Sequence, residues 1–389
     1  MIEIKKKYRI FLTAGEPSGD ALGVKLMQGL KEKLPDQVEF YGVGGPLMCA
    51  EGLHTLFPMD ELTVMGIFEV LPRLRRILKR ISETAKKVSE LKSDIFISID
   101  APDFSFRVAK KLHGSTIPKV HYVAPSVWVW RPGRAQKIAG LYDHLLTVLP
   151  FEPPYFTAVG LPATFVGHSV VETGADTGNA DAFKAAHQIS PEEKILLLLA
   201  GSRRGEVTRH LPIFEKALEK VKTDVGDFTV VAPVIGPSGS IVGEALKSWP
   251  FKCIVVDGNQ EKYDAMAAAD VALAASGTVG LELALAGLPN VIGYKMNPLT
   301  SWVARRLIKI RHVNLINILL KKDIVPEHIL EFCTVENLHR SLTELFSSDQ
   351  KRQAQIDQFH EAMILLGQGG EAPGARAADV ILKLITEKE

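Results

Sequence analysis

Two carboxylates flank a proline in the segment Asp100-Ala101-Pro102-Asp103, which directly follows an apolar stretch ending at Ile99. A partly desolvated carboxylate at the end of a strand is suited to act as a general base towards a hydroxyl group. Asp103 immediately precedes a helical stretch and is the better candidate for its N-cap. We therefore predict that Asp100 is the catalytic base. The alternative is a structural aspartate in a turn.

A glycine, a hydroxyl and a guanidinium follow the apolar run 195–200 in the order Gly201-Ser202-Arg203. The glycine lets the backbone approach a ligand closely. The serine offers a hydroxyl, and the arginine offers a planar fork that suits a phosphate group. The segment is therefore a candidate phosphate-binding loop. The alternative is an ordinary strand-to-helix turn with exposed arginines.

A second anion-binding candidate is the sequence Ser276-Gly277-Thr278, which follows the apolar run 270–274 and opens a helix. The free N–H groups and the positive dipole end of a helix attract anions. Glu282 lies one turn further on, where a carboxylate can accept hydrogen bonds from both ribose hydroxyls. The two segments together predict a site for a nucleoside diphosphate. In the alternative interpretation Ser276 is an N-cap and Glu282 is solvated.

A third loop, residues 15–20, follows the first apolar stretch and holds two glycines and two acids. The acids argue against a phosphate cradle and suit hydroxyl groups, so Glu16, Ser18 and Gly19 are further candidates for the binding cleft. Asp20 is expected to cap the helix that this loop opens.

Several common cofactor signatures are missing from the sequence. It has no GxxxxGK[ST] loop, no GxGxxG after an apolar run, and no Asp-x-Asp that would hold a metal against a diphosphate. The three cysteines share no metal-type spacing. We therefore expect no cofactor and no metal, so that arginines and a helix N-terminus carry the leaving-group charge. The net charge of +1 creates no general field for nucleic acid.

Short apolar runs alternate with longer amphipathic stretches through most of the 389 residues, which predicts parallel strands covered by helices on both faces. The expected strands are 9–14, 38–43, 94–99, 119–123 and 145–148, then 195–200, 228–232, 253–256, 270–274 and 290–293. The small polar residues of 172–181 are typical of a linker. We predict an α/β fold of two Rossmann-like domains, 1–170 and 171–345, that face a central cleft. Terminal helices over 346–389 are expected to pack back on the first domain or on a partner subunit.

Ordered segments along the chain resemble the lipid-A-disaccharide synthase family, which consists of inverting glycosyltransferases of the two-Rossmann-domain B type. The matching segments are AGEPSGD (14–20), MGIFEVL (65–71), IDAPDF (99–104), YVAPSVW (122–128), LPFE (149–152), GHS (167–169), GSR (201–203) and ASGT (275–278). Pro17 departs mildly from the family, which usually has threonine there.

The resemblance implies transfer from UDP-2,3-diacylglucosamine to the 6-hydroxyl of 2,3-diacylglucosamine 1-phosphate (lipid X). The products would be a β(1→6)-linked lipid A disaccharide 1-phosphate, inverted at the donor carbon, and UDP. The resemblance also implies that Asp100 is the base and that Arg203 and the helix start at 276–278 hold the diphosphate without a metal. Asn317 matches a family asparagine near the site, and the alternative is a loop asparagine bonded to backbone. The resemblance suggests a homodimer.

Residues 67–80 combine an apolar and a basic helical face, as a helix at a membrane surface does. The candidates for membrane contact are Ile67, Val70, Leu71, Leu74, Ile77 and Leu78, with Arg73 and Arg76 on the basic side. A core-facing helix is the alternative, but acylated substrates favour the membrane. Trp302–Arg311 is a second basic-apolar stretch. Because no apolar stretch is long enough to span a bilayer or to form a signal segment, we expect a cytoplasmic enzyme bound peripherally to the inner face of the inner membrane.

Other functions remain open on the residues alone. A UDP-N-acetylglucosamine epimerase, or another transferase of the same fold, would share the diphosphate site and need no lipid surface. A non-catalytic nucleotide-sugar sensor would bind UDP and tolerate the loss of Asp100. A dinucleotide oxidoreductase is disfavoured because its glycine fingerprint is missing.

Overall fold

The computed structural model describes residues 6–62, 67–129, 133–234, 238–275, 279–297 and 312–387, with only the helical course given for 67–74. The chain divides into two compact units. The first comprises the residues up to Ser169 and those from Gly369 onwards, and the second comprises Val170–Gln368. The segment 346–389, expected to be one terminal piece, is thereby shared between the two units.

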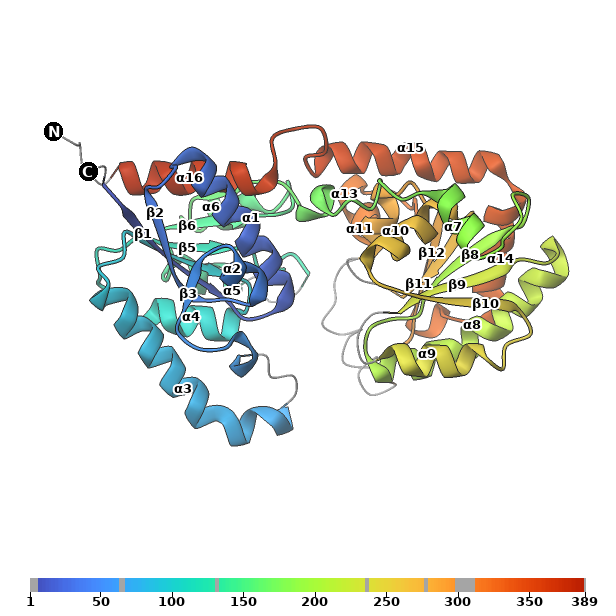
Figure 1. Cartoon of the computed structure of the whole chain (residues 1–389), viewed down its shortest axis with the longest axis horizontal. Helices are drawn as coiled ribbons and strands as arrows, with labels where there is room; N and C mark the ends of the chain where they lie inside the picture. Colours follow the sequence, from blue (N-terminus) through green and yellow to red (C-terminus); the bar gives the residue numbers. More distant parts are fainter. Residues whose placement is uncertain are drawn as a thin grey trace. The chain divides into compact units, whose positions relative to one another are not determined.

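The first unit contains a seven-stranded parallel sheet in the order β3-β2-β1-β4-β5-β6-β7. Figure 1 labels β1, β2, β3, β5 and β6 of this sheet. Its strands are β1 (Tyr8–Ala14), β2 (Val38–Val43), β3 (Leu53–Thr55), β4 (Ile95–Ile99), β5 (Lys119–Tyr122), β6 (His144–Thr147) and β7 (Ala163–Phe165). Every strand that the apolar runs of this half predict is present, whereas the edge strands β3 and β7 were not expected. The strand order reverses between β1 and β4, and ligands of open α/β sheets bind at such a point.

Helices cover both faces of this sheet because successive residues of a strand point to opposite sides. The helices are α1 (Pro17–Lys33), α2 (Pro46–Ala50), α3 (Ile67–Glu90), α4 (Pro102–Lys111), α5 (Gly133–Ala139), α6 (Pro153–Thr157) and α16 (Pro373–Thr386), with a short 3-10 helix η1 (Met59–Glu61). In β1, Ile10 and Leu12 are buried with residues of α1 and α16, whereas Phe11 is buried with residues of α3, α4 and α5.

The last helix, α16, completes the first unit by packing on α1. A Cβ atom on Gly29 would lie only 2.8 Å from the carbonyl oxygen of Gly374, so the two backbones approach each other where side chains are lacking. Ala377 and Ile381 of α16 are fully buried in the core of this unit. The helix is therefore an integral part of the first unit.

The second unit repeats this plan with a six-stranded parallel sheet in the order β10-β9-β8-β11-β12-β13. Its strands are β8 (Ile195–Leu199), β9 (Thr229–Val234), β10 (Lys252–Asp257), β11 (Val271–Ala274), β12 (Asn290–Tyr294) and β13 (Glu327–Ile329). Its helices are α7 (Ala180–Ala186), α8 (Arg204–Val225), α9 (Gly239–Leu246), α10 (Asn259–Ala268), α11 (Val279–Leu285), α13 (Leu315–Leu320), α14 (Val335–Ser347) and α15 (Asp349–Leu365). Only β13 lacks a matching apolar run.

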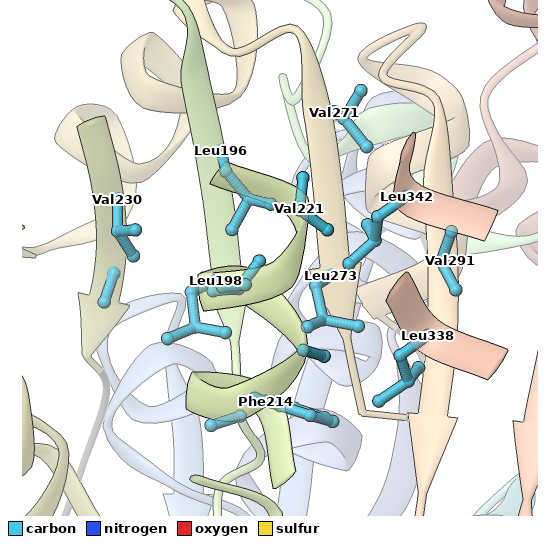
Figure 2. Packing of buried hydrophobic residues seen from close by; sticks show 14 of the residues in the cluster. Leu196, Leu198, Phe214, Val221, Val230, Val271, Leu273, Val291, Leu338 and Leu342 are labelled. Atoms are coloured by element: carbon cyan, nitrogen blue, oxygen red, sulfur yellow. The ribbon is translucent and has the colours of Figure 1, made fainter. Parts of the chain in front are cut away.

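The helices α8 and α14 pack against one face of the second sheet, as Figure 2 shows. Leu198 of β8 and Leu273 of β11 meet Phe214 of α8, and Leu338 and Leu342 approach from α14. All five side chains are almost fully buried. Burying such a side chain stabilises the fold by roughly 1.5–3 kcal/mol, so this layer gives the strand ends above it a rigid support.

The polar segment 172–181, expected to be a linker, is attached to the second unit. The backbone N–H of Asn179 donates to Oδ1 of Asp264 in α10 across 2.8 Å. A Cβ on Gly178 would lie 2.0 Å from the carbonyl oxygen of Tyr263, so only glycine fits there. The small residues of this segment therefore serve a close approach to α10 rather than a loose connection.

Candidate active site

The order reversal of the first sheet brings the two predicted loops of that unit together. Ala14 at the end of β1 pairs with Ile99 at the end of β4, so the loop 15–20 and Asp100 emerge side by side. A Cβ on Gly15 would lie 2.7 Å from the Cβ of Ala101, and this contact requires glycine.

Asp100 has an unusual backbone for a residue with a side chain. Asp100 and Ala101 both adopt left-handed conformations, with φ of 50° and 45°. Left-handed conformations of residues other than glycine are strained and concentrate at functional sites. The turn is held because the Asp100 N–H donates to the Tyr122 carbonyl across 3.0 Å and the Ser105 hydroxyl donates to the Asp100 carbonyl across 2.9 Å. The half-buried carboxylate is thus presented at the strand end.

Asp103 does not cap α4, contrary to expectation. The helix begins at Pro102, its N-cap residue is Ala101, and no side chain caps it. Asp103 lies exposed in the first turn, where a negative charge is favourable but makes no capping hydrogen bond. The prediction placed the helix start two residues too late.

In the loop 15–20, Glu16 is half-buried, Ser18 is exposed and Gly19 packs against the strand ends. Asp20 is a helix cap, as expected, but it caps a different helix from the one predicted. Its buried carboxylate accepts the backbone N–H groups of Gly45, Leu47 and Met48 at 2.9–3.0 Å, and it therefore caps α2 rather than its own helix α1. Asp20 joins the loops that follow β1 and β2.

The second sheet also reverses its order, and it does so between the two predicted donor loops. β8 and β11 are neighbours, and the N–H of Ala275 donates to the carbonyl of Leu199 across 2.8 Å. Gly201 has a φ of 114°, and a Cβ there would lie 3.7 Å from the Cβ of Ala275. Residues 276–278 lie outside the described residues, but the residue preceding them is in place beside Gly201.

Arg203 stands at the start of α8, with a side chain that is 66% exposed. Its guanidinium donates to Glu206 across 2.9 Å, and the Tyr294 hydroxyl donates to the same carboxylate oxygen across 3.0 Å. Burial alone would raise the pKa of Glu206, but these two hydrogen bonds, together with the charge of Arg203 and its backbone N–H, hold the pKa below its usual value. Ser202 is exposed beside Arg203. The loop therefore presents a hydroxyl and an oriented guanidinium.

A buried histidine fixes the base of this loop. The N–H of Lys295 donates to Nε2 of His210 across 3.0 Å, so the ring proton is on Nδ1, which donates to the carbonyl of Ala200 across 2.8 Å. Burial lowers the pKa of His210 and favours this neutral form. His210 thereby links the ends of β8 and β12 on either side of β11. No motif in the sequence points to this histidine.

Glu282 lies in α11, but it is not simply solvated. Both carboxylate oxygens contact the ammonium group of Lys262, at 2.9 and 3.1 Å, and the Tyr263 hydroxyl lies 3.4 Å from Oε1. The Glu282 side chain is 21% exposed and so remains open to a ligand. Lys262 was not predicted from the sequence, since nothing local connects it to a carboxylate twenty positions away.

Asn317 uses its side chain within the fold. Its Nδ2 donates to the Val325 carbonyl across 2.8 Å and to the Glu327 carboxylate across 2.6 Å, while its Oδ1 accepts the N–H groups of Ile324 and Val325. The residue is almost fully buried. This geometry corresponds to the alternative of an asparagine bonded mainly to backbone.

The predicted membrane helix α3 begins at Ile67, the first residue of the predicted stretch, so that Pro72 falls inside it. Arg76 and Arg80 both donate two hydrogen bonds to Glu61, at 2.7–2.9 Å. The bonds from Arg80, and then those from Arg76, lower the pKa of Glu61 to about 2. Arg76 is thus an ion-pair partner and not an isolated cation.

The described part of this predicted surface is the C-terminal end of the stretch 67–80. Leu78 is 44% exposed and Ile77 is half-buried. The side chains of Ile67, Val70, Leu71, Arg73 and Leu74 lie outside the described residues, as does Trp302–Arg311. No helix in the described part of the chain is long and apolar enough to cross a bilayer.

The Lipid-A-disaccharide synthetase family model matches residues 10–375. The chain belongs to this family. A family member from Rhodospirillum centenum, named Lipid-A-disaccharide synthase, is 50% identical over 385 residues, which cover 98% of this chain and 96% of the relative. One from Paramagnetospirillum magneticum is 42% identical over 382 residues, with 97% and 98% covered.

Solved structures place the family within a wider fold. The crystal structure of MurG from Acinetobacter baumannii matches with a TM-score of 0.59 at 14% identity, covering 98% of this chain and 99% of that one. UDP-GlcNAc 2-epimerase from Neisseria meningitidis, bound to UDP-GlcNAc, matches with a TM-score of 0.60 at 13% identity, covering 98% and 100%. At such identities the likeness shows the fold alone: two parallel α/β units of the glycosyltransferase B type.

Proposed function

We propose that this family member transfers a diacylglucosaminyl group from UDP-2,3-diacylglucosamine to the 6-hydroxyl of lipid X. The products are the β(1→6)-linked lipid A disaccharide 1-phosphate and UDP. The observation that carries the proposal is the family match over residues 10–375, within which both strand-order reversals carry the expected polar loops. Family membership favours this reaction over an epimerase or a non-catalytic sensor.

Asp100 is the proposed general base. Its carboxylate takes the proton of the acceptor 6-hydroxyl as the hydroxyl oxygen attacks the donor carbon, and the bond from that carbon to the UDP oxygen breaks. Attack from the face opposite the leaving group inverts the carbon. The left-handed turn at Asp100 supports the assignment because it holds the carboxylate at the strand end against a conformational cost. Glu16, Ser18 and Gly19 lie beside it, where hydroxyl groups of the acceptor are proposed to bind.

The UDP group is proposed to bind at the reversal of the second sheet. Gly201 allows close approach of the diphosphate, Ser202 and Arg203 bind it, and the segment 276–278 contributes backbone N–H groups. Glu282 accepts the ribose hydroxyls. Charge on the departing diphosphate is stabilised by the guanidinium and the N–H groups, so the proposed reaction needs no metal.

Both proposed substrates carry acyl chains, so the enzyme is proposed to act at a membrane surface. The exposed Leu78 and the exposed cations Arg75 and Lys79 on α3 support contact with an anionic bilayer. We place the enzyme in the cytoplasm, bound peripherally to the inner face of the inner membrane. A homodimer is proposed on family resemblance alone.

Mass analysis of the product tests the reaction. The enzyme is supplied with UDP-2,3-diacylglucosamine and lipid X in mixed micelles, and in parallel with UDP-N-acetylglucosamine. We expect a disaccharide 1-phosphate only from the acylated pair, and EDTA should leave its rate unchanged. Epimerised donor without a disaccharide would overturn the proposal, and a rate that EDTA abolishes and magnesium restores would overturn its metal-free part.

A further inference from the structure

A buried lysine is paired with the proposed ribose-binding carboxylate. Lys262 belongs to α10, which precedes β11, and Glu282 belongs to α11, which follows it. The lysine side chain is only 6% exposed, and its ammonium group contacts both oxygens of Glu282 at 2.9 and 3.1 Å. An ammonium group is rarely buried to this extent unless it is paired, so the two charges depend on each other.

The pair leaves Glu282 able to accept further hydrogen bonds. An ionised carboxylate offers about four acceptor positions. Lys262 takes one on each oxygen, and the Tyr263 hydroxyl, at 3.4 Å, makes a long third contact that a ligand can displace. A neighbouring pair of ribose hydroxyls therefore finds acceptors on a carboxylate whose orientation is already fixed.

The pairing of Lys262 with Glu282 reduces the electrostatic repulsion between the carboxylate and the proposed ligand. The proposed ligand carries a diphosphate, and an uncompensated carboxylate close to it would repel it. A carboxylate is nevertheless the group that best accepts two hydroxyl hydrogens. Placing a cation behind the carboxylate keeps its acceptor capacity and removes most of its repulsion.

We infer that Lys262 is a positioning residue that orients Glu282 and cancels its charge, so that the site accepts a nucleoside diphosphate rather than only a nucleoside. This inference rests on the proposed function, since it takes Glu282 to be the ribose ligand. A purely structural ion pair between α10 and α11 is the competing explanation. It predicts equal effects on charged and uncharged ligands.

The test compares binding of UDP and uridine, measured by titration calorimetry on the full-length enzyme. In Lys262→Met we expect UDP to bind on the order of tenfold more weakly or worse, and uridine to lose much less, because only UDP meets the unpaired charge. In Glu282→Gln we expect both ligands to weaken by a similar factor, because the ribose contact is impaired in both.

The double variant is decisive. Adding Glu282→Gln to Lys262→Met removes the lone negative charge, so UDP should bind more tightly to the double variant than to Lys262→Met alone. Lys262→Arg should stay close to wild type, and Lys262→Gln should fall between the wild-type and Met variants. The matched control is Lys220→Met, which breaks the exposed ion pair to Glu336 in the same unit and should change neither ligand.

Two outcomes would overturn the inference: equal losses of UDP and uridine in Lys262→Met, or a double variant that binds UDP no better than that single variant. Should Lys262→Met fail to fold, the UDP-to-uridine ratio in Lys262→Gln, compared with that in wild type, decides the same point. Failure of the proposed donor site would look different, because Arg203→Ala would then leave UDP binding unchanged whatever happened at Lys262.

Discussion

The indole N–H of Trp128 donates to Oε1 of Glu152 across 3.3 Å, joining the loops that follow β5 and β6. Trp128 also packs edge-on against Phe151, with ring centroids 5.2 Å apart. Glu152 is only 2% exposed, and its Oε2 accepts the N–H of Leu149. Burial outweighs these hydrogen bonds and raises the pKa of Glu152 to about 7.

This raised pKa makes stability depend on pH. Between pH 4.5 and 7 the unfolded chain loses the Glu152 proton while the folded protein keeps it, so the contribution of this group to stability falls as pH rises. The expected loss is about 3 kcal/mol, complete above pH 7. Urea unfolding at pH 4.5 and pH 8 measures it, and Glu152→Gln should lose correspondingly less over that interval. Parallel losses in both proteins would contradict the prediction.

Asp100→Asn should reduce turnover about a hundredfold to ten-thousandfold, because the proton acceptor is lost. UDP affinity should remain near wild type, since Asp100 belongs to the first unit and the loops proposed to bind UDP belong to the second. Initial rates with both acylated substrates and a UDP titration measure the two effects. Asp103→Asn is the matched control, as it removes an exposed carboxylate three residues away and should stay within a fewfold of wild type. If the turnover of Asp100→Asn also stays within a fewfold of wild type, Asp100 is not the base.

Arg203→Ala should weaken UDP binding roughly ten- to hundredfold, because a charge-assisted hydrogen bond to the diphosphate contributes about 1.5–3 kcal/mol. Titration calorimetry measures this loss. Lys220→Ala, at the distant end of the same helix α8, provides the control and should leave the affinity unchanged. A UDP affinity that does not respond to the loss of Arg203 would remove this residue from the site.

Leu78→Ser should lower binding to vesicles that contain anionic lipid, and Leu71→Ser with Leu74→Ser should lower it further, because each change removes apolar surface from the proposed contact. Sedimentation with vesicles measures the bound fraction. Leu78 is already 44% exposed, so its variant should keep its thermal stability. Leu365→Ser on α15 removes a leucine with 42% exposure and serves as the control. If Leu78→Ser and Leu365→Ser change the vesicle-bound fraction equally, the membrane contact does not involve this part of α3.

Asp20→Asn should destabilise the first unit by about 1–3 kcal/mol, because one carboxylate satisfies three N–H groups at the start of α2 and an amide cannot. Urea unfolding monitored by circular dichroism measures the change. Glu32→Gln, which removes an exposed acid from the same helix α1, should leave the midpoint within experimental error. An equal shift in both variants would argue against the cap.

The main sheets could be predicted because a buried parallel strand needs an uninterrupted apolar run, and each such run became a strand. The loops after 195–200 and 270–274 were expected to share one site, and Gly201 and Ala275 do lie close together. The strand-order reversals, and the meeting of Gly15 with Ala101, were not predicted. The edge strands β3, β7 and β13 were not predicted, because each has only three residues, too few for a recognisable apolar pattern.

Pairings between loops and helices could not be predicted, because their partners are adjacent in the sheet and not in the sequence. Asp20 illustrates this: a local capping rule assigns it to its own helix, whereas the neighbouring loop after β2 offers three unsatisfied N–H groups. A Cβ on Gly45 would lie 2.5 Å from its carboxylate, which explains a glycine that the sequence left without a role. Lys262 and Glu282 are a different case, because their helices directly precede and follow β11, but no local rule pairs two side chains twenty positions apart.

The return of α16 to the first unit has a consequence for how the chain is made. The second unit is an insertion within the first, since residues 170–368 lie between the two parts of that unit. During translation the second unit is therefore complete before the first, reversing the usual order in which N-terminal domains finish folding earliest. Until α16 has left the ribosome, Leu26 and Leu30 of α1 lack the α16 partners that help to bury them. We expect a chain that stops before Pro373 to complete the second unit but to leave these α1 side chains without their α16 cover.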